Sequence, residues 1–263
     1  MKKLNVALLQ SDLKWENKSE NLDQFDIKLS ILQSDVDLVV LPEMFNTGFS
    51  MNTNLAEGMN GPSVVWMLAK AKALTCHVVG SLIVKENEKI YNRLLCVSPD
   101  GDIATYDKRH LFTMAEEDKY FDAGDVKAIV DINGFKVNLQ VCYDLRFPVW
   151  IRNKYANGKH DYDVIIYVAN WPEVRSKVWR NLLQARAAEN MVYVIGVNRV
   201  GVDGTGKSYN GDSMTVDPWG SILVQSKKPI EETLHASLDM ELLQDARSKF
   251  PVANDADNFK LLG

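Results

Sequence analysis

The decisive stretch of this 263-residue sequence reads Leu139-Gln140-Val141-Cys142-Tyr143-Asp144-Leu145-Arg146-Phe147-Pro148. Its apolar first part, which ends at Val141, is typical of a buried strand. Cys142 follows at once, where a strand turns into a helix whose first N–H groups and positive dipole end favour a thiol of lowered pKa. The alternative is an inert core cysteine, because free cysteine is often buried. Asp144 and Arg146 make the surroundings more polar than a core position needs, so a nucleophile is the better interpretation.

The composition is that of one ordinary globular α/β domain over residues 1–263. Hydrophobic residues make up 46% of the chain and charged residues 25%, and the length suffices for a sizeable core. With 30 basic and 35 acidic residues the formal net charge is −5, so we expect no nucleic-acid partner and no binding to anionic membranes. No apolar run approaches the ~18 residues of a membrane-spanning helix.

The three cysteines, Cys76, Cys96 and Cys142, form neither an even disulfide framework nor a C-x-x-C metal motif. This usage indicates a reducing, cytoplasmic setting. We expect no metal and no cofactor.

Hydrophobic periodicity predicts alternating strands and helices with several tight hairpins. Strands are predicted at 4–9, 37–41, 76–84, 90–98, 103–106, 126–131, 135–141, 163–169, 191–197, 213–216, 221–224 and 231–238. Helices are predicted at 17–34, 62–75, 144–157, 174–190 and 240–248. The pattern favours an α/β fold in which two mixed sheets pack face to face with helices outside them. The segment 249–263 has little periodicity and is expected to lie over other surfaces or on a partner subunit.

Three chemically active side chains, Glu43, Lys108 and Cys142, each follow a predicted strand. Sites in α/β sheets form beyond the carboxyl ends of strands, so we expect the three to converge. A carboxylate can take the proton of a thiol, and an ammonium group can stabilise a thiolate and an oxyanion. The combination suits acyl transfer through a thioester, although Glu43 alone could be a helix-terminal carboxylate and Lys108 a solvated loop lysine.

Histidine is poorly placed for a cysteine–histidine pair. His77 and His235 fall in predicted strands, and His160 falls near a surface segment. His110, two residues after Lys108, is the one histidine that remains a candidate.

Three segments of the chain resemble the signature segments of the nitrilase, or carbon–nitrogen hydrolase, superfamily. They are Leu41-Pro42-Glu43-Met44-Phe45, Tyr106-Asp107-Lys108-Arg109-His110-Leu111-Phe112 and Val141–Pro148, in the order and at the spacing of that family. The likeness extends over nearly the whole chain. It implies an αββα four-layer sandwich that dimerises into an αββα–αββα assembly.

The resemblance also implies roles for individual residues. Glu43 would be the general base, Lys108 the electrostatic stabiliser and Cys142 the nucleophile. The family has a second glutamate soon after the lysine, which we assign to Glu116, with Glu117 as the near alternative. The oxyanion would meet the Lys108 ammonium and the backbone N–H of the residue after the cysteine.

Within the superfamily, the segments Cys142–Pro148 and 108–117 are similar to the bacterial omega-amidases, which hydrolyse the terminal amide of 2-oxoglutaramate to 2-oxoglutarate and ammonia. Arg146 suits such a substrate, because a guanidinium binds a free carboxylate with two hydrogen bonds. The alternative for Arg146 is a structural ion pair with Asp144 or with an acid at the end of a helix. Tyr143 and Trp171 are expected to wall the pocket, although aromatic residues near strand ends often belong to the core.

Two other functions remain open. The chain could be another carbon–nitrogen hydrolase, such as an N-carbamoyl or a deaminated-glutathione amidase. It could also be a non-catalytic binding or scaffold protein that kept the fold, although the intact Glu43, Lys108 and Cys142 argue against this.

Overall fold

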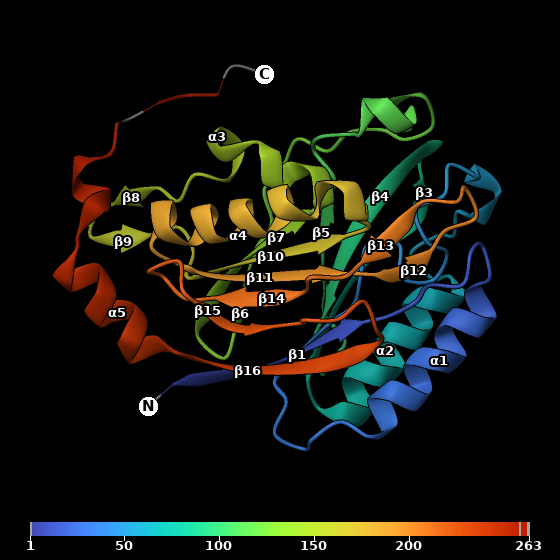
Figure 1. Ribbon diagram of the computed structural model, residues 1–263, viewed down its shortest axis with the longest axis horizontal. Coiled ribbons are helices and arrows are strands. Elements are labelled where there is room, and N and C mark those ends of the chain that lie inside the picture. The colour runs from blue at the N-terminus through green and yellow to red at the C-terminus, as the bar shows by residue number, and fades with distance from the viewer. Residues whose placement is uncertain (1, 258, 262–263) are drawn as a thin grey trace.

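Two six-stranded β-sheets pack face to face at the centre of the molecule (Figure 1). The computed structural model describes residues 2–257 and 259–261. The first sheet has the strand order β16-β1-β2-β3-β4-β5. Its strands are β1 (Lys3–Gln10), β2 (Leu38–Val40), β3 (His77–Glu86), β4 (Lys89–Val97), β5 (Ile103–Asp107) and β16 (Glu232–Asp239).

The second sheet has the strand order β15-β14-β11-β10-β7-β6. Its strands are β6 (Ile129–Ile132), β7 (Phe135–Val141), β10 (Val164–Ala169), β11 (Tyr193–Asn198), β14 (Met214–Val216) and β15 (Ile222–Gln225). In each sheet three neighbouring strands are parallel, β1-β2-β3 in the first and β7-β10-β11 in the second, and antiparallel strands extend them. The predicted pair of mixed sheets is therefore confirmed.

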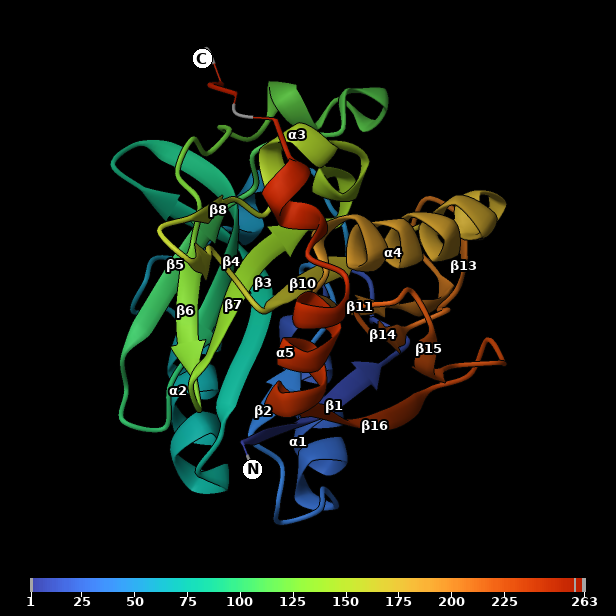
Figure 2. The ribbon, with the colours of Figure 1, turned by 90° about the vertical axis from the view of Figure 1, so that its left-hand side faces the viewer.

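Helices lie on the outer faces and at the ends of this sandwich (Figure 2). They are α1 (Lys18–Ser30), α2 (Pro62–Leu74), α3 (Pro148–Ile151), α4 (Ser176–Asn190) and α5 (Met240–Lys249). Helices α1 and α2 pack on the first sheet, and α4 packs on β11 of the second. The approach of α4 requires a glycine, because a Cβ on Gly196 would lie 2.5 Å from the side chain of Leu183. No helix in the part of the chain described is long and apolar enough to cross a membrane.

Side chains that alternate along a strand let the first sheet pack on the second sheet with one face and on the helices with the other. In β1, Val6 and Leu8 face the second sheet, whereas Ala7 and Leu9 pack with α1 and α2. Successive side chains of a strand point to opposite faces, so a strand covered on both faces is apolar throughout. This explains why the sequence shows continuous apolar runs where the structure has its central strands.

The predicted helix at 144–157 is wrong. The chain instead forms a 3₁₀ turn at Cys142–Arg146 and the single helical turn of α3, followed by a short hairpin of β8 (Tyr155–Ala156) and β9 (Lys159–His160). Asn157 and Gly158 at its tip have φ values of 52° and 75°. Asn-Gly is the usual sequence of such a tight hairpin turn, and this signal should have outweighed the helical interpretation.

Two loops also contain more order than the sequence suggests. The glycine-rich segment 198–212 contains a hairpin of β12 (Val200–Val202) and β13 (Ser208–Asn210). The described part of the C-terminal segment contains a 3₁₀ turn at Val252–Asp255, and the Phe259 ring lies 5.7 Å from the Lys154 Nζ. This part packs on its own chain. Residues 258 and 262–263 of the segment expected on a partner subunit lie outside the described residues.

Candidate active site

The structure brings Glu43, Lys108 and Cys142 together at one end of the sandwich. Glu43 follows β2, Lys108 follows β5 and Cys142 follows β7. Strands β2 and β5 run in the same direction within the first sheet, because two antiparallel steps separate β5 from β3. Both strands therefore deliver their last residues to the same edge, and β7 delivers Cys142 from the facing sheet.

A buried ion cluster is the centre of this site. The Lys108 Nζ lies 2.9 Å from the Glu43 Oε1 and 2.9 Å from the Glu117 Oε2, and all three side chains are fully buried. Burial alone would lower the pKa of Lys108, but the two carboxylates outweigh it and raise that pKa. The ammonium group is therefore charged at neutral pH.

The structure places Glu117, the near alternative, beside Lys108, and it places the expected Glu116 outside this cluster. Glu116 is exposed, has a φ of 58° and pairs with Lys119 at 2.6 Å. It joins two 3₁₀ turns, Thr113–Ala115 and Glu117–Lys119, and this left-handed junction turns the next side chain inward. Glu117 then accepts a hydrogen bond from the Phe112 N–H at 2.6 Å and reaches Lys108.

Two asparagines fix the carboxylate of Glu43. The Asn92 side-chain amide donates to the Glu43 Oε1 at 2.8 Å, and the Asn170 backbone N–H donates to the Oε2 at 2.8 Å. The Asn170 side chain also donates to the Glu43 backbone carbonyl at 2.6 Å. With Lys108, these donors hold both carboxylate oxygens, so the orientation of Glu43 is set before any ligand binds.

Cys142 has a left-handed backbone conformation, with a φ of 42°. A non-glycine residue in this region is strained by about 1–3 kcal/mol, and such strain is common at functional sites. The Cys142 residue is partly exposed, whereas Cys76 and Cys96 are buried. The sharp turn therefore points the thiol into the pocket rather than into the core.

The expected lowering of the thiol pKa is contradicted. Burial raises the pKa of Cys142 well above its usual value, Glu43 raises it further, and Lys108 only partly opposes this. The turn after Cys142 is a five-residue 3₁₀ turn rather than a long helix, so it offers little dipole. At neutral pH the group is therefore a thiol, and a role as nucleophile would require a neighbouring base to take its proton.

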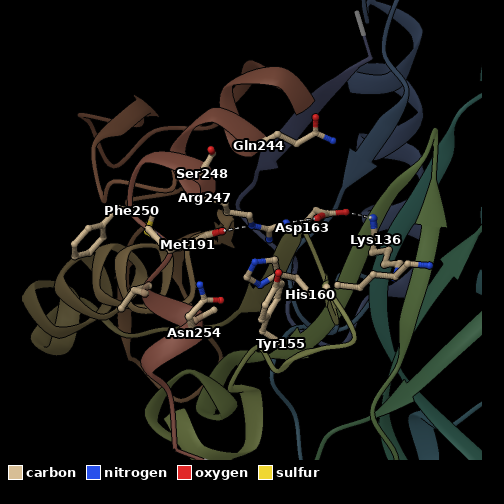
Figure 3. A pocket seen from close by; sticks show the side chains of 15 residues that line it. Lys136, Tyr155, His160, Asp163, Met191, Gln244, Arg247, Ser248, Phe250 and Asn254 are labelled. Carbon is tan, nitrogen blue, oxygen red and sulfur yellow. Dashed lines mark hydrogen bonds and ion pairs between the residues drawn. The ribbon is translucent and has the colours of Figure 1, made fainter.

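A narrow pocket opens onto Cys142 and Lys108, and the predicted pocket residues Tyr143, Arg146 and Trp171 all line it. Other aromatic rings complete the wall, and two further cations stand beside Arg146. These additional residues are Phe49, Phe112, Tyr209, Arg175 and Lys207. A larger cavity of about 590 Å³ lies elsewhere, against α5 and the β8–β9 hairpin, and contains none of these residues (Figure 3).

Arg146 makes no ion pair with any residue in the described part of the chain. Its guanidinium lies 5.1 Å from the centre of the Trp171 ring and is exposed. The alternative partner, Asp144, is fully occupied by other donors. It accepts hydrogen bonds from the His110 N–H, the Tyr106 hydroxyl and the Val141 N–H.

His110 serves this same carboxylate. Its Nδ1 lies 2.7 Å from the Asp144 Oδ1, and its ring stacks on Phe147 with the centroids 3.7 Å apart. His110 is absent from the pocket wall. The described contacts thus tie His110 to the turn that carries Cys142, and they give it the position of a supporting residue rather than a base.

The sequence did not identify Asn92, Arg175, Lys207 or Tyr209 as site residues. Asn92 lies within β4, Arg175 ends the 3₁₀ turn Glu173–Arg175, and Lys207 and Tyr209 belong to the β12–β13 hairpin. Only Asn170 had a detectable signal, because Asn170-Trp171-Pro172 follows an apolar strand as Glu43 and Cys142 do.

Comparison with known proteins identifies the family. The carbon–nitrogen hydrolase model matches residues 5–248. Omega-amidase YafV of Escherichia coli K12 is 43% identical over 98% of both chains, and a 2-oxoglutaramate amidase of Bacillus subtilis is 31% identical over 96% of this chain and 97% of its own. The chain therefore belongs to the carbon–nitrogen hydrolase family.

A solved structure supports the same assignment. A CN-hydrolase superfamily protein from Xanthomonas campestris, with an arsenic adduct in its active site, superimposes with a TM-score of 0.96. It is 39% identical, and the match covers 99% of this chain and 100% of that one. The expected nitrilase-like sandwich is thereby confirmed.

The first prediction concerns the thiol. Because the Glu43 carboxylate raises the pKa of Cys142, Glu43→Gln should lower that pKa and increase the thiolate fraction at neutral pH. The midpoint of the rate–pH profile for alkylation by iodoacetamide should move to lower pH. Cys76 and Cys96 interfere little, because burial raises their pKa values to about 11 and about 12. Glu116→Gln is the matched control, and an unmoved midpoint in Glu43→Gln would contradict the electrostatic coupling.

The second prediction concerns stability. Glu117→Ala should lower the free energy of unfolding by about 3–5 kcal/mol, because it removes one partner of a buried ion pair. Glu116→Ala, one residue away on the surface, should change it by no more than about 0.5 kcal/mol. Urea unfolding of both variants measures the difference, and equal effects would show that Glu117 does not hold the cluster together.

Proposed function

We propose that this carbon–nitrogen hydrolase is a thiol-dependent amidase. It hydrolyses the terminal amide of a short dicarboxylate monoamide, such as 2-oxoglutaramate, to the acid and ammonia. The observation that carries the proposal is the pocket in which Cys142 stands beside the buried Glu43–Lys108–Glu117 cluster. The relatives named omega-amidase and 2-oxoglutaramate amidase support the substrate class.

Acylation begins with proton transfer from Cys142 to Glu43. The raised pKa of the thiol makes this transfer necessary, and Glu43 is held by Asn92, Asn170 and Lys108 in a fixed orientation to receive it. The sulfur then attacks the amide carbon, and the carbonyl oxygen gains the negative charge. The Lys108 ammonium and the Tyr143 N–H stabilise that oxyanion. As the C–N bond breaks, Glu43 returns the proton to the leaving nitrogen, and ammonia departs.

Deacylation uses the same groups, with water in place of the thiol as the nucleophile. Glu43 takes a proton from a water molecule, the hydroxide attacks the thioester carbon, and Lys108 again faces the oxyanion. The C–S bond then breaks, the acid is released and the thiol regains its proton. One carboxylate thus acts twice, as base and then as acid in each half-reaction.

Glu117 supports this chemistry without touching the reacting atoms. It holds Lys108 from one side while Glu43 holds it from the other, so that the ammonium cannot turn away. A lysine is compact and mobile on a long stem, and a second carboxylate is the means by which its position is fixed. Glu117 is therefore a positioning residue.

Arg146 supports a substrate with a free carboxylate. It lines the pocket, stacks on Trp171 and has no acidic partner among the residues described. Tyr143 and Trp171 supply apolar walls for the short carbon chain between amide and carboxylate. An N-carbamoyl or deaminated-glutathione amidase would share the catalytic groups, but the relatives aligned over nearly the whole chain support the omega-amidase function.

We further propose that the chain is a single domain, that two copies form a homodimer and that the enzyme works in the cytoplasm. The family resemblance supports the dimer, and the exposed rings of Trp219 and Phe250, with centroids 6.4 Å apart, offer apolar surface for contact. Three free cysteines support a reducing compartment.

The third prediction tests the function directly. The wild-type protein should release ammonia from 2-oxoglutaramate and succinamate, and Cys142→Ala should abolish this with unchanged circular dichroism. Glu43→Gln should lower kcat by ~10²-fold or more, as for a lost general base. This loss is expected even though the Cys142 thiol of Glu43→Gln should be more ionised than that of the wild type. A coupled ammonia assay measures both.

The outcomes separate the competing mechanisms. Substantial turnover by folded Cys142→Ala would exclude the thioester route. A loss in His110→Ala as large as in Glu43→Gln would favour a cysteine–histidine mechanism. A wild-type protein that releases ammonia from no amide of a broad panel would favour a binding protein.

The fourth prediction concerns assembly. Light scattering during size-exclusion chromatography should give twice the mass of one 29.7 kDa chain at micromolar concentration. A mass of one chain under these conditions would exclude a stable dimer.

A further inference from the structure

The wall of the pocket carries four cations and no acid among the residues described. Arg146, Arg175 and Lys207 line it together with Lys108. The charge of Lys108 is balanced by Glu43 and Glu117, whereas none of the other three has an acidic partner within ion-pair distance in residues 2–257 and 259–261. Unpaired cations around a small pocket, beyond those that the chemistry needs, indicate a charged ligand.

Of the three unpaired cations, Arg175 is held in the position best suited to bind a carboxylate. Its backbone is fixed at both ends, because its N–H donates to the Pro172 carbonyl at 3.0 Å and its carbonyl accepts from the Trp171 Nε1 at 2.9 Å. Its guanidinium lies 5.3 Å from the centre of the Phe112 ring. A guanidinium that lies over an aromatic ring keeps its N–H edge free for a carboxylate.

Lys207 reaches the same pocket from the β12–β13 hairpin. The buried Asp203 organises this hairpin by accepting hydrogen bonds from the Thr205 N–H, the Lys207 N–H and the Tyr209 hydroxyl, at 2.8 Å, 3.0 Å and 2.8 Å. Tyr209 itself lines the pocket. The Lys207 side chain is exposed, so it adds charge rather than a rigid contact.

Arg146 differs from Arg175 in its exposure. Arg146 is exposed, whereas Arg175 is half-buried. Water screens an exposed charge more strongly, and an exposed side chain loses more freedom when it binds. Arg175 should therefore contribute more to carboxylate binding than Arg146.

We propose that Arg175, assisted by Lys207, is the principal anchor of the distal carboxylate, and that the acid-free wall selects the substrate by charge. This inference rests on the proposed amidase function. It predicts that ω-amides with a carboxylate and no ammonium group are preferred. An amino-acid amide such as L-glutamine carries an α-ammonium group, which would lie among cations with no carboxylate to receive it, so it should be rejected.

The test measures kcat/KM for succinamate, L-glutamine and neutral butanamide in the wild type and in single variants. Arg175→Met should reduce the succinamate-to-butanamide ratio about tenfold or more, as expected for lost hydrogen bonds to a charged group. Arg146→Met and Lys207→Met should reduce the ratio less. Arg175→Lys should restore part of it, because the charge returns without the two-pronged geometry.

Lys177→Met is the matched control. Lys177 is an exposed cation two residues after Arg175 and is absent from the pocket wall, so its removal should leave the ratio unchanged. The proposal would be overturned if Arg175→Met had the same succinamate-to-butanamide ratio as the wild type, or if Arg146→Met lowered that ratio more than Arg175→Met does. Efficient L-glutamine hydrolysis by the wild type would overturn the charge selection.

A binding experiment separates this inference from the proposed function. Succinamate should raise the melting temperature of Cys142→Ala, and Arg175→Met in that background should reduce the shift, whether or not the wild type turns over an amide. If the wild type hydrolyses succinamate but Arg175→Met changes neither the succinamate-to-butanamide ratio nor the melting-temperature shift, only the assignment of Arg175 as anchor is wrong. If the wild type hydrolyses no amide while succinamate binding depends on Arg175, only the amidase function is wrong.

Discussion

The structure depends on a lysine buried between two carboxylates. An unpaired ammonium in the interior would cost several kcal/mol of desolvation, so Lys108 can be buried only because Glu43 and Glu117 hold it. These residues come from the ends of β2 and β5 and from the loop that follows. The cluster thus joins separate parts of the chain, and the same contacts that hold the fold fix the polar groups opposite Cys142.

The resting thiol has a consequence for the chemistry. Free cysteine nucleophiles are often activated by a lowered pKa, but here burial and Glu43 raise the pKa of Cys142. Such a thiol is protected from oxidants and alkylating agents that need the thiolate. In the proposed mechanism it becomes a nucleophile only when Glu43 takes its proton as the sulfur bonds to the substrate carbon. In that mechanism the Glu43 carboxylate, which raises the pKa of the thiol, would also be the base that activates it.

The sequence predicted what depends on long-range pattern and missed what depends on local turns. Apolar runs located the central strands, and residues at strand ends located Glu43, Lys108 and Cys142. The sequence pattern could not decide between Glu116 and Glu117, because a single residue with a left-handed backbone determines which of the two side chains turns inward. Arg175 and Lys207 were missed because a cation on a loop looks the same whether it faces water or a pocket.

The charge distribution explains how one pocket can bind an amide and release an acid. In the proposed binding mode the substrate amide is neutral where it meets Cys142, with the acidic Glu43 and Glu117 beyond Lys108 and the cationic wall around the distal end. Hydrolysis converts the amide into a second carboxylate next to Glu43. This new charge is repelled at short range in a poorly solvated site, while ammonia leaves as a neutral molecule. Substrate and product share the contacts at the distal end, so the reacting end must distinguish them, and it does so by charge.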